Sequence, residues 1–402
     1  MKNINTITIV LAVLVFTGCE NELLLNPTYQ DTFIKYFGMG GDQTDELGVD
    51  MAAASDGFVL LGETISNRGK RSIYVVKTNV LGNDVWQQKY DAEFDVSPSS
   101  LAIAPDGSMI IGATSVDSTG NKDILMLLLD SQGNLIDSAL FKNKLFDEEV
   151  SEVIVTEDGG FAVIGTTTEV IPPKITGILV LRTYPQSLDT LPRTEWTRIH
   201  DGGTSNTGVG IVQSGNVFYC LGTSDSKIGQ TPDRKLTNFQ FFSLDMFGEP
   251  ISDNGYQGST DNERSSEVIK TEGGFVLLGN TIATSGSGIY VVRLSKNMVV
   301  INDFSIFGNN ITGNSIVDIG SGYVILGYKE ELTGDRNIYL VNTDKFGNIV
   351  KERTYGSLAE KDEGGKGLVV LENGHIAFVA TVDMGSQTKM ALFKTDPAGD
   401  LY

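Results

Sequence analysis

The feature that most constrains the fold is a short apolar run that recurs seven times along the chain. Each run ends on a small residue, and successive runs lie 48 to 57 residues apart. The runs cover residues 58–62, 109–112, 161–165, 218–222, 275–279, 323–327 and 376–380. A period of that length is typical of an array of supersecondary units, so the sequence predicts a repeat protein.

Each repeat contains four strand-like runs, which in the fifth repeat are residues 266–271, 275–279, 289–294 and 299–307. β-Branched and aromatic residues alternate or cluster within them, and helical periodicity is absent. Short links such as Asp56-Gly57 join the first and second runs and favour tight hairpins. The third and fourth runs are joined by links such as residues 344–348, with Gly in the fourth place of a turn. The sequence therefore predicts an all-β fold.

One strand is missing from the end of this pattern. Tyr402 directly follows the turn at residues 396–400 that leads into the last fourth strand. The N-terminal segment 31–37 ends on Phe37-Gly38, as a typical fourth strand ends on Tyr355-Gly356. We expect this segment to pair with residues 389–395 and close a ring, which removes open sheet edges. The prediction is a seven-bladed β-propeller with four antiparallel strands per blade.

The first residues have the properties of a targeting segment. Lys2 precedes an apolar stretch at residues 4–16, which is shorter than the about 20 residues of a membrane-spanning helix. The following Thr17-Gly18-Cys19 resembles a bacterial lipobox, and that resemblance implies cleavage before Cys19 and its acylation. The predicted organisation is a signal peptide at residues 1–18, a tether at 19–30 and one propeller domain at 31–402.

Charge and residue usage exclude several kinds of function. The formal net charge of −21 argues against nucleic acid or an anionic membrane surface as a partner. Cys220 lies within an apolar run, so we expect a buried thiol. His200 occupies the ring position that ends the fourth strands, which favours a packed ring over a catalytic base. With two histidines and one free thiol, the chain has few of the side chains that a zinc site or a nucleophilic triad needs. No cofactor is predicted.

The ring places each kind of link on one face. The short hairpins lie on a lower face, and the variable second-to-third and fourth-to-first links lie on an upper face, where function is expected. The closing segment enters from the lower face, so the anchor lies below and the upper face points away from the membrane. Between Cys19 and Asp31 there are eleven residues, which reach at most about 36–40 Å.

Charged residues gather in the upper links. The candidate acidic rim for a ligand or cation consists of Asp45, Glu46, Asp95, Glu148, Glu149, Glu263, Asp362 and Glu363. The candidate basic loops contain Arg68, Lys70, Arg71, Arg234 and Lys235. A solvated rim with weak salt bridges and a binding site in the channel mouth are both open interpretations. Residues 117–123 space oxygen donors as a calcium loop does, although an ordinary turn also explains them.

A second basic position recurs near the end of the third strands. It holds Lys77, Arg182, Arg293 and Lys394. We expect these side chains to pair with carboxylates between neighbouring blades rather than to bind a ligand.

The repeats resemble those of a known group. Asp-x-x-Gly-Asn hairpins, a terminal Tyr or Phe and a later Asp-Gly-Gly-Phe run resemble β-propeller repeats of cell-surface proteins and lipoproteins in Bacteroidota-type bacteria, over residues 29–402. The resemblance implies a fold and an outer-membrane address but no activity. Glu20 and Glu22 resemble the acidic export tag of surface lipoproteins, which favours the cell surface over the periplasm.

These observations favour a membrane-anchored, non-enzymatic lipoprotein whose upper face binds a protein or a glycan, and which meets the bilayer only through its acyl anchor. One alternative is a secreted hydrolase or lyase acting on polysaccharide, with two rim carboxylates as acid and base. The other is an accessory subunit of an outer-membrane assembly or uptake complex.

Overall fold

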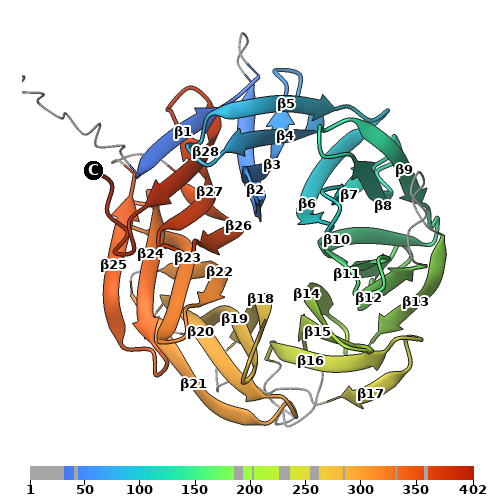
Figure 1. The fold of residues 1–402 in the computed structure, drawn as a ribbon. Helices are drawn as coiled ribbons and strands as arrows, with labels where there is room; N and C mark the ends of the chain where they lie inside the picture. Colours follow the sequence, from blue (N-terminus) through green and yellow to red (C-terminus); the bar gives the residue numbers. More distant parts are fainter. Residues whose placement is uncertain are drawn as a thin grey trace, which may run out of the picture.

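A computed structural model describes residues 31–39, 44–184, 193–201, 203–225, 236–253, 262–283, 286–308, 310–331, 333–356 and 361–402. Seven four-stranded antiparallel sheets stand around a central axis (Figure 1), which confirms the predicted all-β, seven-bladed propeller. The predicted signal segment, Cys19 and the predicted tether lie outside the described residues, as do Arg234 and Lys235. Within the described ranges, no helix is long and apolar enough to cross a membrane.

In blades 1 to 6 the four strands run in chain order from the centre of the ring outward, and in blade 7 the N-terminal strand is outermost. Blade 1 consists of β2 (Asp45–Ala54), β3 (Gly57–Ile65), β4 (Arg71–Asn79) and β5 (Asp84–Tyr90). Blade 2 consists of β6 (Asp95–Ile103), β7 (Met109–Val116), β8 (Lys122–Leu129) and β9 (Leu135–Phe141). Blade 3 consists of β10 (Phe146–Val155), β11 (Phe161–Glu169), β12 (Thr176–Thr183) and β13 (Thr194–His200). Blade 4 consists of β14 (Asn206–Ser214), β15 (Val217–Ser224), β16 (Asn238–Asp245) and β17 (Pro250–Asp253). Blade 5 consists of β18 (Asn262–Thr271), β19 (Gly274–Ala283), β20 (Gly286–Ser295) and β21 (Val300–Phe307). Blade 6 consists of β22 (Ile311–Asp318), β23 (Gly322–Glu330), β24 (Arg336–Asp344) and β25 (Ile349–Tyr355). Blade 7 consists of β26 (Glu363–Val370), β27 (Ile376–Asp383), β28 (Thr388–Thr395) and β1 (Phe33–Phe37).

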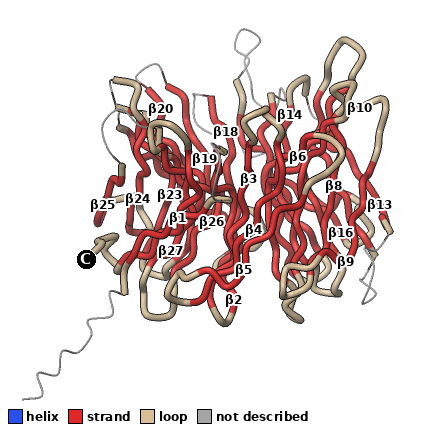
Figure 2. Tube along the Cα trace, turned by 90° about the horizontal axis from the view of Figure 1, so that it is seen from above, coloured by secondary structure: helices blue, strands red, loops and turns tan. Residues whose placement is uncertain are grey.

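The ring closes as predicted, through the N-terminal strand. β1 pairs antiparallel with β28, with Phe33 opposite Lys394 and Phe37 opposite Met390. The N–H of Tyr402 donates to the Thr32 hydroxyl over 2.9 Å, so the two ends of the described chain meet. Asp31 lies 3.7 Å from the Lys394 ammonium, beside the short hairpins of the lower face. The chain therefore enters the ring from below (Figure 2).

The core lies between the blades. Second and third strands are buried along almost their whole length, as in β3 and β4, because neighbouring blades cover both faces of each sheet. Cys220 is fully buried in the cluster between blades 3 and 4, as expected, and burial raises the pKa of its thiol. His200 stacks on Phe242 with ring centroids 4.2 Å apart, which confirms its packing role.

Among the described residues, the lower turns of five blades contact the blade before them, through Gly82, Gly133, Gly248, Gly347 and Gly399. The glycine of a third-to-fourth turn packs against a ring on the outer strand of the preceding blade, as Gly133 does against Trp86. The Tyr90 hydroxyl donates to the carbonyl of Gly133 over 2.5 Å. These glycines have φ near +80°, so the small residue serves both the turn and the close approach. The Tyr355 hydroxyl makes the same bond to the Gly399 carbonyl, so these two terminal rings hold the turn of the next blade.

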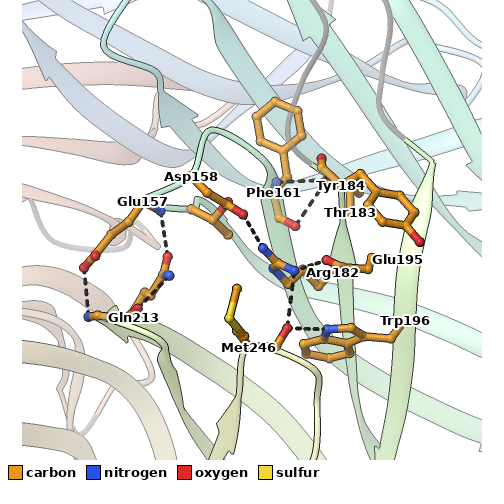
Figure 3. A network of polar contacts seen from close by, with 12 residues as sticks. Glu157, Asp158, Phe161, Arg182, Thr183, Tyr184, Glu195, Trp196, Gln213 and Met246 are labelled. Carbon is orange, nitrogen blue, oxygen red and sulfur yellow. Dashed lines mark hydrogen bonds and ion pairs between the residues drawn. The ribbon is translucent and has the colours of Figure 1, made fainter.

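The basic position of the third strands differs from the prediction. Arg182 pairs with Asp158 and Glu195 of its own blade (Figure 3). Toward the next blade it donates to the Met246 carbonyl and lies over the Phe218 ring, and neither of these contacts is an ion pair. Lys77 likewise pairs with Asp56 in its own blade. The expectation of ion pairs between blades is therefore wrong, because the nearest carboxylates lie in the lower hairpin and outer strand of the same sheet.

Candidate functional site at the mouth of the central channel

The innermost strands all have a pairing irregularity. In six blades one residue is unpaired: Val49, Ser99, Ser151, Val209, Ser266 and Asn314. In blade 7 the irregularity extends over residues 365–367. A bulge turns a side chain away from its ladder and bends the strand. Bulged residues from five of these blades then meet at the centre of the ring.

They line a central cavity of about 670 Å³. Its walls carry hydroxyl, amide and small apolar groups, supplied by Val49, Ser151, Val209, Ser266 and Asn314, together with Lys366. Residues of the upper links and adjoining strand ends also line it: Lys361, Glu363, Thr381 and Thr388. The cavity therefore belongs to the upper part of the channel, which is the face predicted to carry function.

Three carboxylates follow the bulges in alternate blades. Each accepts the backbone N–H of the next blade's innermost strand: Asp50 from Leu101 at 2.8 Å, Glu152 from Ile211 at 2.7 Å and Glu267 from Ile316 at 2.5 Å. These bonds link blades 1 and 2, 3 and 4, and 5 and 6 around the channel. We call the three residues the channel carboxylates.

Lys366 of blade 7 lies among them. Its ammonium donates to the Ser151 carbonyl of blade 3 over 3.0 Å, across the channel. Burial raises the pKa of Glu152 to about 7 and that of Glu267 to about 8, and mutual repulsion of the two carboxylates adds to the Glu267 shift. The pKa of Asp50 is also raised by burial, and the charge of Lys366 opposes the shift. At neutral pH, Glu152 and Glu267 are therefore partly protonated.

Four of the eight predicted rim residues are buried rather than exposed: Glu46, Glu148, Glu263 and Asp362. Glu46, with 0 % of its surface exposed, pairs with Lys389 of blade 7. Asp362 accepts the N–H of Asp383 at 2.7 Å, and Glu148 accepts from the Asn143 amide at 3.2 Å. Burial raises the pKa of the Glu148 carboxyl. These side chains fix the upper ends of the blades.

The other four rim residues tie one blade to the next. Asp45 accepts the N–H of Thr388 at 2.8 Å, and Asp95 accepts that of Arg71 at 3.1 Å, each at the start of the preceding blade's third strand. Two ion pairs make similar ties, Lys122 with Glu149 and Arg336 with Glu363. Of the eight, Glu363 lines the central cavity. Their role as ligands stays a prediction.

The predicted basic loops are only partly described. Arg68 and Lys70 line, together with Asp95, an open hollow of about 380 Å³ between blades 1 and 2. Lys70 donates to the Ala92 carbonyl at 2.9 Å, and Arg71 pairs with Glu63 at 2.6 Å. This hollow is a further recess of the upper face.

In the candidate calcium loop at residues 117–123, carboxylate oxygens accept hydrogen bonds from within the loop. Asp117 accepts from both the N–H and the hydroxyl of Thr119 at 2.7 Å, and Asn121 donates to Asp123 at 3.0 Å. In the part of the chain that the structure describes, no group of three or more His, Cys, Asp or Glu side chains is placed to hold a metal ion.

Sequence reasoning missed the channel carboxylates and Lys366. A signal was present, because residues 50, 152 and 267 stand two places after a small or apolar residue on alternate first strands, at about twice the repeat spacing. One anchor of that repeat was also misplaced: Ala113, not Gly112, occupies the position of Gly62, since Ala113 faces Pro98 as Gly62 faces Gly48.

Comparison with known proteins adds resemblance in fold only. No protein-family model matches the chain, and no curated protein matches it. Among solved structures, it is similar to a subtype N10 neuraminidase-like protein of A/little yellow-shouldered bat/Guatemala/060/2010, at 8 % identity and TM-score 0.46, over 76 % of this chain and 96 % of that one. A protein of unknown function from Dyadobacter fermentans DSM 18053 matches at 11 % identity and TM-score 0.45, over the same shares. The soluble aldose sugar dehydrogenase from Escherichia coli matches at 11 % identity and TM-score 0.42, over 74 % of this chain and 99 % of that one. Likenesses this distant carry no argument about activity.

Proposed function

We propose that the chain is an outer-membrane lipoprotein, anchored through acylated Cys19, that binds a polar ligand at the mouth of its central channel without chemical turnover. The ligand is a protein loop or the end of a glycan. The finer resemblance to lipoproteins of Bacteroidota-type bacteria and a cell-surface location belong to this proposal.

The observation that supports it is the central cavity. About 670 Å³ lies within the range of small-molecule sites, which are concave and largely preformed. Its walls come from the rigid innermost strands, and its mouth comes from the variable links. A preformed recess loses little conformational entropy on binding.

The lining suits a ligand rich in hydrogen-bonding groups. Ser151, Ser266 and Asn314 contribute hydroxyl and amide groups, and the Lys361 and Lys366 ammoniums add positive charge. Val49 and Val209 supply apolar contact between them. Sugar hydroxyls or peptide groups match this mixture of donors, acceptors and small apolar surfaces.

The same lining argues for binding over hydrolysis. A glycoside hydrolase requires two carboxyl groups flanking the bond to be cleaved. Glu363 is the one carboxylate among the described residues that line the cavity, and it is paired with Arg336. The channel carboxylates Asp50, Glu152 and Glu267 are each engaged by a backbone N–H.

Binding at the mouth is tested by filling it. In Val209→Trp a large ring enters the cavity from a bulge whose side chain makes no hydrogen bond, whereas Leu140→Trp places the same ring on the exposed outer strand β9. We expect capture on a glycan array, or crosslinking on intact cells, to be lost in Val209→Trp and kept in Leu140→Trp. Equal capture by both folded variants would contradict the site.

The acylation of Cys19 and the cellular location of the propeller are tested in separate experiments. Palmitate labelling should depend on Cys19 and disappear in Cys19→Ala, and protease added to intact cells should degrade the propeller. A protected propeller would move the protein to the periplasmic side, and a stoichiometric copurified membrane complex would favour the assembly-subunit alternative.

A further inference from the structure

The lower end of the outer wall carries a band of exposed apolar side chains. They lie in the third-to-fourth turns and at the starts of the outer strands of five blades: Val80, Leu81, Val85, Leu135, Ile136, Phe247, Ile251, Val299, Val300, Ile301, Phe346, Ile349 and Val350. We call this band the lower collar. Large exposed apolar surfaces are rare on soluble proteins, and where they occur they mark a contact surface.

The tips of the collar are held outward by their turns. Phe346, which is 73 % exposed, follows Asp344, and the Asp344 carboxylate accepts the N–H groups of Phe346 and Asn348 at 2.8 and 2.9 Å. Asp245 fixes the turn of Phe247, 63 % exposed, in the same way. The rings therefore protrude from rigid turns and gain nothing from the propeller's own core.

The collar is at the end where the chain enters. Asp31 lies on the lower face, and the eleven residues that separate it from Cys19 span at most about 40 Å. An anchor at Cys19 therefore confines the lower face to the neighbourhood of the bilayer. Part of the acidic charge on this face is compensated by ion pairs, since Asp56, Asp158 and Asp318 are bound by Lys77, Arg182 and Lys345.

We propose that the lower collar inserts into the lipid surface of the membrane to which the chain is tethered, so that the propeller stands on the bilayer with its channel mouth facing away. The orientation rests on the proposed anchor at Cys19. The contact goes beyond an acyl chain alone, because exposed apolar side chains held beside a bilayer are stabilised when they leave water for the boundary between headgroups and acyl chains.

The test places a fluorescent reporter at matched positions of the two faces. The chain from Cys19 to Tyr402 is coupled through the Cys19 thiol to maleimide lipid in phosphatidylcholine vesicles that contain brominated acyl chains; Cys220 is buried and does not compete. Phe247→Trp and Phe346→Trp report on the collar. Ile171→Trp is the control, because Ile171 is 70 % exposed in the second-to-third link of blade 3, on the upper face.

We expect brominated acyl chains to quench the added fluorescence of both collar variants and to leave that of Ile171→Trp unchanged. Unquenched collar variants, or quenching equal to that of Ile171→Trp, would overturn the proposal. If the collar is unquenched and the chain sediments as a dimer, the collar belongs to a second copy. Because coupling is chemical, a failure here is independent of palmitate labelling in cells, which tests the anchor itself.

Discussion

At the scale of single residues, the propeller depends on a few positions where backbone approaches backbone. Blade 7 has the sequence Gly364-Gly365-Lys366-Gly367 on its innermost strand. A Cβ atom at Gly367 would lie 2.2 Å from the backbone nitrogen of Met51 in blade 1. Glycine is required there so that the last blade can reach the first and Lys366 can enter the channel.

The substitution Gly367→Ala is expected to destabilise the fold by about 1–3 kcal/mol, because backbone cannot move aside as a flexible side chain does. Urea unfolding measures the change. Gly273→Ala is the control, since a Cβ atom there meets only the Thr271 hydroxyl at 3.9 Å. If the two variants unfolded at the same urea concentration, the close approach of blades 7 and 1 would be wrong.

The channel carboxylates make stability depend on pH. In the folded chain Glu267 keeps its proton up to a pKa of about 8, whereas in the unfolded chain it ionises near its ordinary value of 4.5. The folded state therefore binds more protons between these values, and its stabilisation is present below pH 4.5 and lost as the pH rises through 8. Each such group contributes a slope of at most about 1.4 kcal/mol per pH unit.

We expect the free energy of unfolding to fall between pH 5 and 8 and the fall to be smaller in Glu267→Gln, which keeps an acceptor for the Ile316 N–H but cannot ionise. Glu272→Gln in the nearby lower hairpin serves as the control. A wild-type profile that is flat in this range, or an unchanged slope in Glu267→Gln, would contradict the buried carboxylates.

At the scale of strands, local sequence determined what could be predicted. Alternation and hairpin residues are local signals, so the four strands per blade and the closing strand followed from the chain alone. The bulges did not, because they depend on how an innermost strand packs beside its neighbours. The burial of Glu46 was also beyond local reasoning, since its partner Lys389 lies 343 residues away. Several charges that the sequence predicts as an exposed rim are therefore engaged in contacts within and between blades.

Removal of the closing strand is the sharpest test at this scale. Deleting residues 31–38 uncovers the outer edge of β28 and removes the buried Phe37. We expect a loss of about 3–5 kcal/mol, the scale set by one large apolar side chain and a row of backbone groups. Phe37→Ala should account for much of it, and Tyr36→Ala, on the exposed side of the same strand, for little. A shortened chain with an unchanged Tm would contradict ring closure by β1.

At the scale of the whole molecule, the net charge of −21 opposes compaction. Raising sodium chloride from about 0.02 to 0.3 M should therefore increase the Tm, because screening weakens this repulsion more than it weakens the individual surface ion pairs. Thermal unfolding monitored by circular dichroism measures the shift. Calcium chloride at the same ionic strength is expected to act equally, and a further saturable increase with calcium would instead establish a specific site.

The closing strand also has a mechanical meaning. β1 starts at the lower face and is held by its pairing with β28 along the direction in which it runs. A pull on the N-terminus loads all five residue pairs from Phe33 to Phe37 in shear at once, rather than peeling them one after another. The strand that completes the ring is thus also the element through which any tension applied at the N-terminus reaches the propeller.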